Sequence, residues 1–375
     1  MSARAVDPLS VFTALAELPS PPGSERQVAD RVSGYLRASS LEVSEDDAGA
    51  QIGSDTGNLL ARLAPTVEDG LPIFLCAHLD TVPLEGTLEP VVTDGVVRNA
   101  GGTILGADNK AAVAAMLVAA DRIQHEGRPH AGVELLFTPK EEVGLLGASA
   151  FDSSRLHARV GFVYDQAGPI GEVILGAPFQ RALDVRFRGR AAHAGMVPEE
   201  GRSAIEGAAR AIADFRLGRL DEETTASVGL IQGGTAPNVV PEHCSFTADV
   251  RCHDEGKLLS LVQEMIDTVT FAAGLAECQA DVTIREGARG YRFREGDLPV
   301  RLASDALRRA GYEPRYALTG GGADANVFNA RGLECLNLAN GMANIHTPAE
   351  EISVADLEGM VEVSLALVEA ARDAR

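Results

Sequence analysis

Acidic and imidazole side chains stand directly after apolar runs at five places in the sequence. The residues concerned are His78 and Asp80, Asp108, Glu141 and Glu142, Asp165, and His346. Taken singly, such residues are usually solvated or satisfied within a core. Together, two histidines and three carboxylates match the ligands of a hydrolytic site that holds two metal ions about 3.5 Å apart around a shared water. We therefore expect these segments to converge on one metal centre.

The candidate ligands are far apart in the sequence, so different elements of the fold must carry them. No zinc fingerprint of the H-E-x-x-H type is present. The nearest imitation, residues 125–130, is one residue too long and contains Pro129, which breaks a helix. The sequence also lacks a G-x-S-x-G nucleophile elbow, a P-loop and a G-x-G-x-x-G after a strand, which removes the commonest rival chemistries.

The elements around these residues predict an α/β arrangement. Residues 73–77 and 133–137 are continuous apolar runs typical of buried strands, and the Ala-rich, periodic residues 110–123 between them predict a helix. A further helix is expected over residues 24–38, with Ser24 at its N-cap. In this arrangement functional sites form where the strands end.

From residue 178 the pattern changes. Alternating residues at 181–188, 247–251 and 278–285 predict strands, and residues 203–215 and 256–274 predict helices. This order predicts a small α+β domain over residues 178–287, inserted into a larger domain made of residues 1–177 and 288–375. Residues 299–310 and a final helix from Val354 resume the first pattern.

Composition excludes several classes of partner. The chain has 33 Lys and Arg against 54 Asp and Glu, a formal net charge of -21, so neither nucleic acid nor an anionic membrane is an expected partner. Its first 21 residues do not read as a secretory leader, and its longest apolar run, residues 111–120, is half of a membrane span. We expect a soluble, cytoplasmic protein.

Its five scattered cysteines form no C-x-x-C pair and are expected to be buried apolar residues.

Nine segments resemble, in order and over nearly the whole chain, the co-catalytic dizinc peptidases of the peptidase T-like type. They are H-L-D-T-V from His78, G-A-D-N-K around Asp108, E-E-V-G from Glu141, Asp165, G-R-A-A-H-A-G around His193, P-N-V-V-P around Asn238, D-V-R ending at Arg251, G-G-A-D-A-N around Asp324, and N-I-H-T-P around His346. The resemblance implies a three-layer α/β catalytic domain with an inserted, ferredoxin-like domain that serves as a dimerisation and lid domain. It also implies a homodimer.

The resemblance assigns metal ligands. His78 and Asp165 would bind one ion, Glu142 and His346 the other, and Asp108 would bridge the two. Two divalent ions per subunit are implied, most readily zinc, although cobalt and manganese suit the same ligands.

Two further acidic residues have implied roles beside the metals. Glu141 would be the general base, because a free carboxylate beside the trapped water can take its proton and return it to the leaving amine. Asp80 would accept the other N–H of the His78 ring. The alternative for Asp80 is a turn-forming residue before Thr81.

In the inserted domain, His193 and Asn238 would reach across to the partner subunit's site, where the histidine stabilises a developing oxyanion. Arg251 would bind a substrate carboxylate or backbone carbonyl; its alternative role is a surface pair with Asp249.

The lysines are a separate observation. Only three are present, and Lys110 and Lys140 flank the proposed Asp108 and Glu141. Either a compact ammonium is required there or the placement is chance.

The expected function is removal of N-terminal residues from short peptides. Asp165 at its ligand position, rather than Glu, resembles the aminopeptidase and dipeptidase branch. Hydrolysis of an N-acyl amino acid or of a C-terminal residue on the same scaffold is the alternative. A non-catalytic metal-binding or peptide-binding relative would be expected to lack Glu141 or a ligand, and both are retained. A short segment between Asp80 and Asp108, and Ala323 in place of Ser or Thr, leave peptide length and residue preference open.

Overall fold

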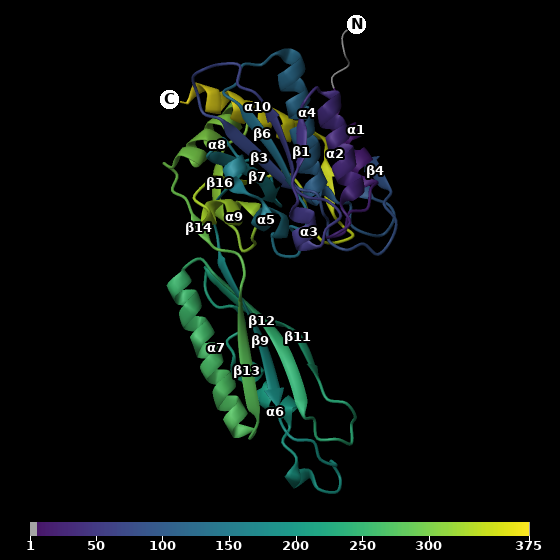
Figure 1. Ribbon diagram of the computed structural model, residues 1–375, viewed down its shortest axis with the longest axis vertical. Helices are drawn as coiled ribbons and strands as arrows, with labels where there is room; N and C mark the ends of the chain where they lie inside the picture. Colours follow the sequence, from purple (N-terminus) through teal and green to yellow (C-terminus); the bar gives the residue numbers. More distant parts are fainter. Residues whose placement is uncertain (1–5, 375) are drawn as a thin grey trace. The chain divides into compact units, whose positions relative to one another are not determined.

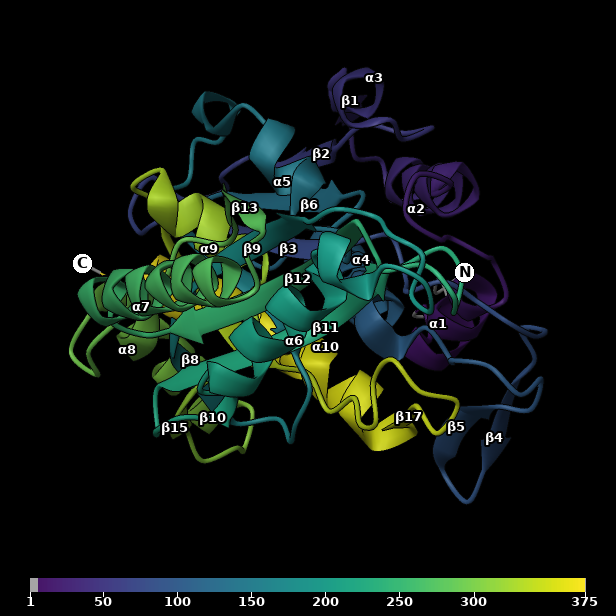
Figure 2. The same cartoon turned by 90° about the horizontal axis from the view of Figure 1, so that it is seen from below.

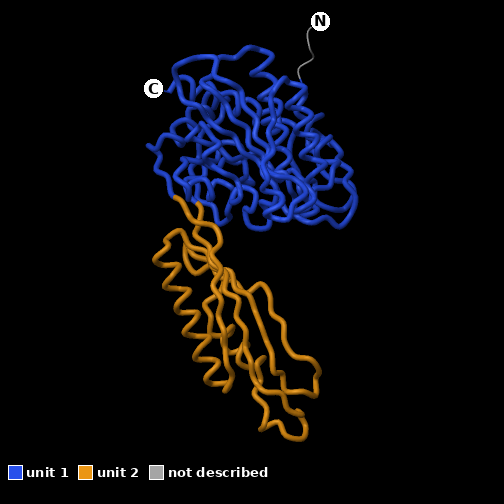
Figure 3. The backbone as a smooth tube through the Cα atoms, in the orientation of Figure 1, with its two compact units in different colours: residues 1–176, 292–375 blue, residues 177–291 orange. Residues whose placement is uncertain are grey.

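The computed structural model describes residues 6–374, which fall into two compact units (Figure 3). Unit 1 consists of the chain up to Gly176 and from Arg292 onward, and unit 2 is Ala177–Tyr291. The range 178–287 expected for the insert lies within unit 2. The unit is wider than that range because the chain does not return to the large sheet until β14 (Tyr291–Arg292).

Unit 1 is built on a nine-stranded mixed sheet (Figure 1). The strands, in sheet order, are β1 (Val43–Glu45), β2 (Leu59–Leu63), β6 (Val133–Thr138), β3 (Ile73–His78), β7 (Val160–Gln166), β16 (Glu334–Ala339), β8 (Glu172–Ala177) and β14, with β15 (Arg315–Leu318) also paired to β8. The four central strands, from β6 to β16, are parallel. Strands β3 and β6 are buried along their whole length, as their continuous apolar runs predict.

Helices cover both faces of this sheet. One layer is α1 (Pro8–Ala16), α2 (Arg26–Ala38), α4 (Ala107–Glu126), α8 (Leu298–Arg309) and α10 (Val354–Asp373), and the other is α3 (Ala48–Ile52), α5 (Leu146–Ala150) and α9 (Asp324–Ala330). Alternate residues of β3 show the division. Leu75 joins the core beneath α4, whereas the Phe74 ring meets Phe328 of α9 edge to face, with 5.3 Å between ring centroids. The expected three-layer α/β class is confirmed.

Two helix starts qualify the sequence prediction. Helix α2 begins at Arg26 with Glu25 at its N-cap, so the predicted cap at Ser24 is wrong. The reason is a turn in which the Ser24 N–H donates to Pro21 O at 2.9 Å. In α4, Asp108 and Asn109 depart from helical geometry, so the regular helix starts at Lys110 as predicted.

A small antiparallel sheet lies beside the main one (Figure 2). Its strands, in sheet order, are β17 (Glu351–Ser353), β5 (Val96–Asn99) and β4 (Pro90–Thr93). Strand β17 follows the segment that carries His346 and Glu350, and its Ile352 pairs with Val97 of β5. No sequence pattern predicts this sheet, because its strands are only three or four residues long.

Unit 2 is a five-stranded antiparallel sheet with two helices. Its strands, in sheet order, are β10 (Gly218–Arg219), β11 (Thr224–Gly233), β12 (His243–Cys252), β9 (Phe179–Arg188) and β13 (Gln279–Glu286), and its helices are α6 (Ala204–Asp214) and α7 (Glu255–Leu275). Alternate residues such as Leu183, Val185 and Phe187 form its core with the helices.

Helix α7 is the one described helix whose length and composition would suit a membrane span. Its Leu258, Val262, Met265 and Val269 are nevertheless buried in the core of unit 2. The same test is passed by core helices of soluble proteins.

Candidate metal centre

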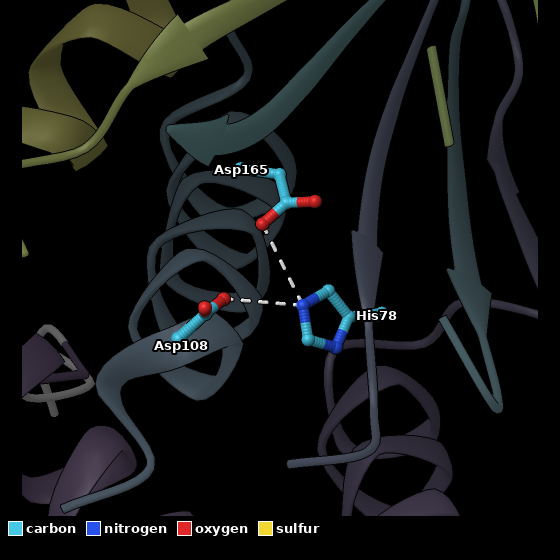
Figure 4. A group of neighbouring side chains, drawn as sticks. All are labelled: His78, Asp108 and Asp165. Carbon is cyan, nitrogen blue, oxygen red and sulfur yellow. Dashed lines mark hydrogen bonds and ion pairs between the residues drawn. The ribbon is translucent and has the colours of Figure 1, made fainter. Parts of the chain in front are cut away.

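The candidate ligands lie at the carboxyl ends of the parallel strands and in the loops beside them. His78 is the last residue of β3 and Asp165 the last but one of β7, while Glu141 and Glu142 follow β6. Asp108 lies at the start of α4. Figure 4 shows His78, Asp108 and Asp165 turned toward one another from three separate elements.

The first group consists of His78, Asp108 and Asp165. The Nε2 atom of His78 lies 3.1 Å from Asp108 Oδ1 and 3.6 Å from Asp165 Oδ1. The ligand atoms of the three side chains lie within 4.8 Å of one another, and the His78 ring is buried.

The second group consists of Asp108, Glu142 and His346. The Nε2 atom of His346 lies 3.2 Å from Asp108 Oδ2 and 3.1 Å from Glu142 Oε1. Asp108 therefore directs one oxygen to each histidine and belongs to both groups. This is the arrangement expected of a carboxylate that bridges two ions.

The electrostatics of the two groups suit a cation. Burial raises the pKa of Asp165 to about 7, and hydrogen bonds to the Asp108 and Glu142 carboxylates raise the pKa of His346 to about 10. The pKa of His78 is also raised, because the Asp165 and Asp108 carboxylates outweigh the effect of burial. Two imidazoles and three carboxylates are a donor set that fits two divalent ions.

Asp80 holds the loop that carries Glu141 and Glu142. Its Oδ1 accepts a hydrogen bond from the Glu141 N–H at 2.9 Å, and its Oδ2 accepts one from the Glu142 N–H at 3.1 Å. The His78 Nδ1 lies 2.9 Å from the backbone carbonyl of Asp80 and 3.4 Å from its carboxylate. The Asp80 carboxylate, expected to orient the His78 ring, therefore lies farther from the ring than the Asp80 carbonyl does. The carboxylate oxygens instead accept hydrogen bonds from the loop after β6.

Glu141 is buried, with 8% of its surface exposed. Burial, together with the charge of Asp165, raises the pKa of its carboxyl well above the usual range. A carboxylate in this condition accepts a proton more readily at neutral pH than an exposed one does.

The family model of peptidase family M20/M25/M40 matches residues 74–370. The chain belongs to this family. It is a hydrolase of the peptidase type, and the resemblance to peptidase T-like enzymes is confirmed.

Three similar proteins align with this peptidase over nearly its whole length. A solved aminopeptidase PepT from Bacillus cereus is 35% identical, with a TM-score of 0.88 and coverage of 97% of this chain and 98% of that one. A solved tripeptidase from Staphylococcus aureus is 31% identical, with a TM-score of 0.92 and coverage of 98% of both chains. The uncharacterized protein YqjE of Bacillus subtilis is 35% identical over 363 residues, 97% of this chain and 98% of its own.

The expected residues of the peptidase's inserted unit lie in unit 2, apart in sequence from the metal groups. His193 and Asn238 are exposed and lie on adjoining loops, where the Ala194 N–H donates to Asn238 O at 3.0 Å. Arg251 donates from Nε to Asp249 Oδ1 at 2.8 Å, the surface pair considered as its alternative role.

Two lysines beside the site have different surroundings. Lys110 is buried and donates from Nζ to Leu18 O at 2.6 Å. Burial lowers its pKa to about 7. Lys140 is half-buried and donates from Nζ to Ile52 O at 2.8 Å.

Three buried carboxylates near the peptidase's metal groups were not singled out from the sequence. Glu25 accepts the Lys140 N–H at 3.1 Å, and Glu350 accepts the Asp108 N–H at 2.8 Å. Asp324 accepts the Thr138 hydroxyl at 2.5 Å, and burial raises its pKa to about 6. Only Asp324 had a signal, because it lies in the G-G-A-D-A-N segment; Glu350 follows His346 by four residues without any pattern of its own.

Proposed function

We propose that this M20 peptidase uses two divalent metal ions to remove N-terminal residues from short peptides. The observation that carries the proposal is the Asp108 carboxylate, whose two oxygens face His78 on one side and His346 on the other. Each histidine is accompanied by a further carboxylate, Asp165 or Glu142.

His78 and Asp165 would hold one ion, Glu142 and His346 the other, and Asp108 both. When bound, the ions would polarise the scissile carbonyl and lower the pKa of water. Zinc is the ion we propose, since imidazole and carboxylate together suit it; cobalt and manganese accept the same ligands.

Glu141 would act as the general base. Its buried carboxylate takes a proton from the attacking water and returns it to the leaving amine. Asp80 holds the Glu141 backbone in place through the 2.9 Å hydrogen bond, so this base has a fixed position relative to His78.

Two observations support recognition of the peptide's amino terminus. Two solved relatives, 35% and 31% identical to this chain, are an aminopeptidase and a tripeptidase. Asp165, rather than Glu, at its ligand position also resembles the aminopeptidase and dipeptidase branch of the family.

Arg251 supports the alternative, hydrolysis of an N-acyl amino acid or of a C-terminal residue. Its side chain is 34% exposed, and a guanidinium can bind a substrate carboxylate with two donors.

We further propose a homodimer in which unit 2 provides the interface and His193 and Asn238 act at the partner's site. The support is that both residues are exposed and lie on adjoining loops of unit 2. A cytoplasmic location is part of the same proposal, supported by five free cysteines.

The test combines metal analysis of the purified protein with a peptide panel. We expect about two zinc ions per chain and cleavage of free-amine tripeptides, loss of cleavage on N-acetylation, and a smaller loss on C-terminal amidation. Cleavage of N-acetylated peptides alone would favour the deacylase or carboxypeptidase alternative. Metal binding without any hydrolysis would favour a non-catalytic relative.

A further inference from the structure

The carboxylate of Glu350 is buried, with 1% of the residue exposed, and it binds backbone N–H groups. Its Oε2 accepts hydrogen bonds from Leu105 and Gly106, and its Oε1 accepts one from Asp108, all at 2.8 Å. Three N–H donors at this distance make charge-assisted hydrogen bonds that involve both oxygens of the carboxylate. Glu350 thereby binds the backbone of the turn that leads into the regular part of α4, which starts at Lys110.

The two partners belong to segments that are distant in sequence and carry ligands of the same metal group. Glu350 ends the segment that contains His346 and precedes β17, while its donors lead directly into the bridging Asp108. The side chains of Asp108 and His346 meet at 3.2 Å. Glu350 therefore joins the backbones of two segments whose side chains form one half of the candidate centre.

We propose that Glu350 is a positioning residue that fixes Asp108 relative to His346 before any metal binds. The proposal rests on the proposed metal centre. Glu350 does not itself ligate an ion, because both of its oxygens are occupied by backbone donors. Glu350 orders the two loops before the metal binds. Metal binding then carries a smaller entropic cost and is stronger.

The Glu350→Gln variant removes this arrangement with almost no change in volume. An amide has one acceptor oxygen, so its NH₂ group must face at least one of the three N–H donors. Repulsion between donors then displaces either the 105–106 turn or Asp108. Glu351→Gln is the matched control, since Glu351 is the neighbouring carboxylate and its side chain, 30% exposed, pairs with Arg98 on the surface.

The decisive measurement is a zinc titration of metal-free protein by competition with a chelator of known affinity. We expect Glu350→Gln to bind zinc about 10–100-fold more weakly than wild type, the usual effect of removing a group that orients a ligand. Glu351→Gln should stay within about twofold, because a surface ion pair contributes little. Wild-type affinity in a folded Glu350→Gln protein would overturn the proposal.

A second measurement uses unaltered protein, so it decides the matter even where the variant fails to fold. Amide hydrogen exchange of metal-free wild type should show protection at Leu105, Gly106 and Asp108. Rapid exchange at these amides until zinc is added would mean that the metal, not Glu350, orders the loop. Neither readout requires peptide cleavage, so failure of the peptidase proposal and failure of this one are separate results.

Discussion

Asp80 and Glu141 are joined by a 2.9 Å hydrogen bond from the Glu141 backbone to the Asp80 carboxylate. Asp80 follows His78 by two residues, and Glu142, bound by the other Asp80 oxygen, lies in the second metal group. One carboxylate thus ties the loop after β3 to the loop after β6. The candidate base and a candidate ligand of each metal group share this support.

Glu141→Gln should retain both metals and lose nearly all peptide hydrolysis. The amide keeps the side chain's size and removes its capacity to take a proton. Glu142→Gln is the contrasting variant and should lower zinc content, because Glu142 faces His346 at 3.1 Å. Zinc per chain and kcat should be measured on the same preparations. Comparable activity in Glu141→Gln and wild type would rule out the assigned role.

Zinc binding should release protons and weaken as the pH falls. The pKa of His346 is raised to about 10 by its hydrogen bonds to carboxylates, and that of Asp165 to about 7 by burial. At neutral pH His346 is therefore protonated and Asp165 is protonated in part, and a metal must displace these protons. Affinity should fall about tenfold per pH unit for each proton released. Calorimetry in two buffers of different ionisation enthalpy measures this release. His243→Ala, which removes an exposed histidine of unit 2, should leave it unchanged, and equal heats in both buffers would contradict the prediction.

His193→Ala should lower turnover while zinc content stays at the wild-type level, because every candidate ligand is in unit 1. Mixed with Glu141→Gln subunits, it should regain activity if His193 acts across the interface, since one site of each mixed dimer has both groups intact. Random pairing predicts about a quarter of wild-type activity in a symmetric dimer. No recovery in verified mixed dimers would place His193 at its own subunit's site.

Lys110 should make stability depend on pH. Its folded-state pKa of about 7 lies below the ordinary lysine value of 10.5, so between these values the unfolded chain binds a proton that the folded chain does not. Wild type should therefore gain stability relative to Lys110→Met as the pH rises from about 7 to 9.5, by at most about 1.4 kcal/mol per unit. Urea unfolding at several pH values measures the difference. Lys257→Met, at an exposed lysine, should show no such trend.

Sequence patterns predicted the elements whose burial is simple. Strands β3 and β6 are buried on both faces and have continuous apolar sequences, and α6 lies within the range 203–215 that its pattern predicts. Strand β11 was missed because most of its residues beyond Ala226 are exposed and no alternation appears. The metal ligands could be predicted from the sequence because metal coordination restricts their residue types. The role of Glu350 could not be predicted, because Glu350 binds backbone N–H groups. Almost any residue type at positions 105 and 106 would supply the same donors.

Strand β8 leaves the large sheet at Ala177, and β14, its neighbour in that sheet, returns at Tyr291. The Phe293 N–H donates to Leu175 O at 2.6 Å, so the outgoing and returning chains are joined where the insert begins and ends. The intervening segment is therefore topologically a long hairpin loop. From this topology we expect that mutation and length change within the insert leave the order and register of the parallel strands unaltered. The inserted unit can therefore change in evolution, while the positions of His78, Asp108 and His346 in unit 1 stay the same.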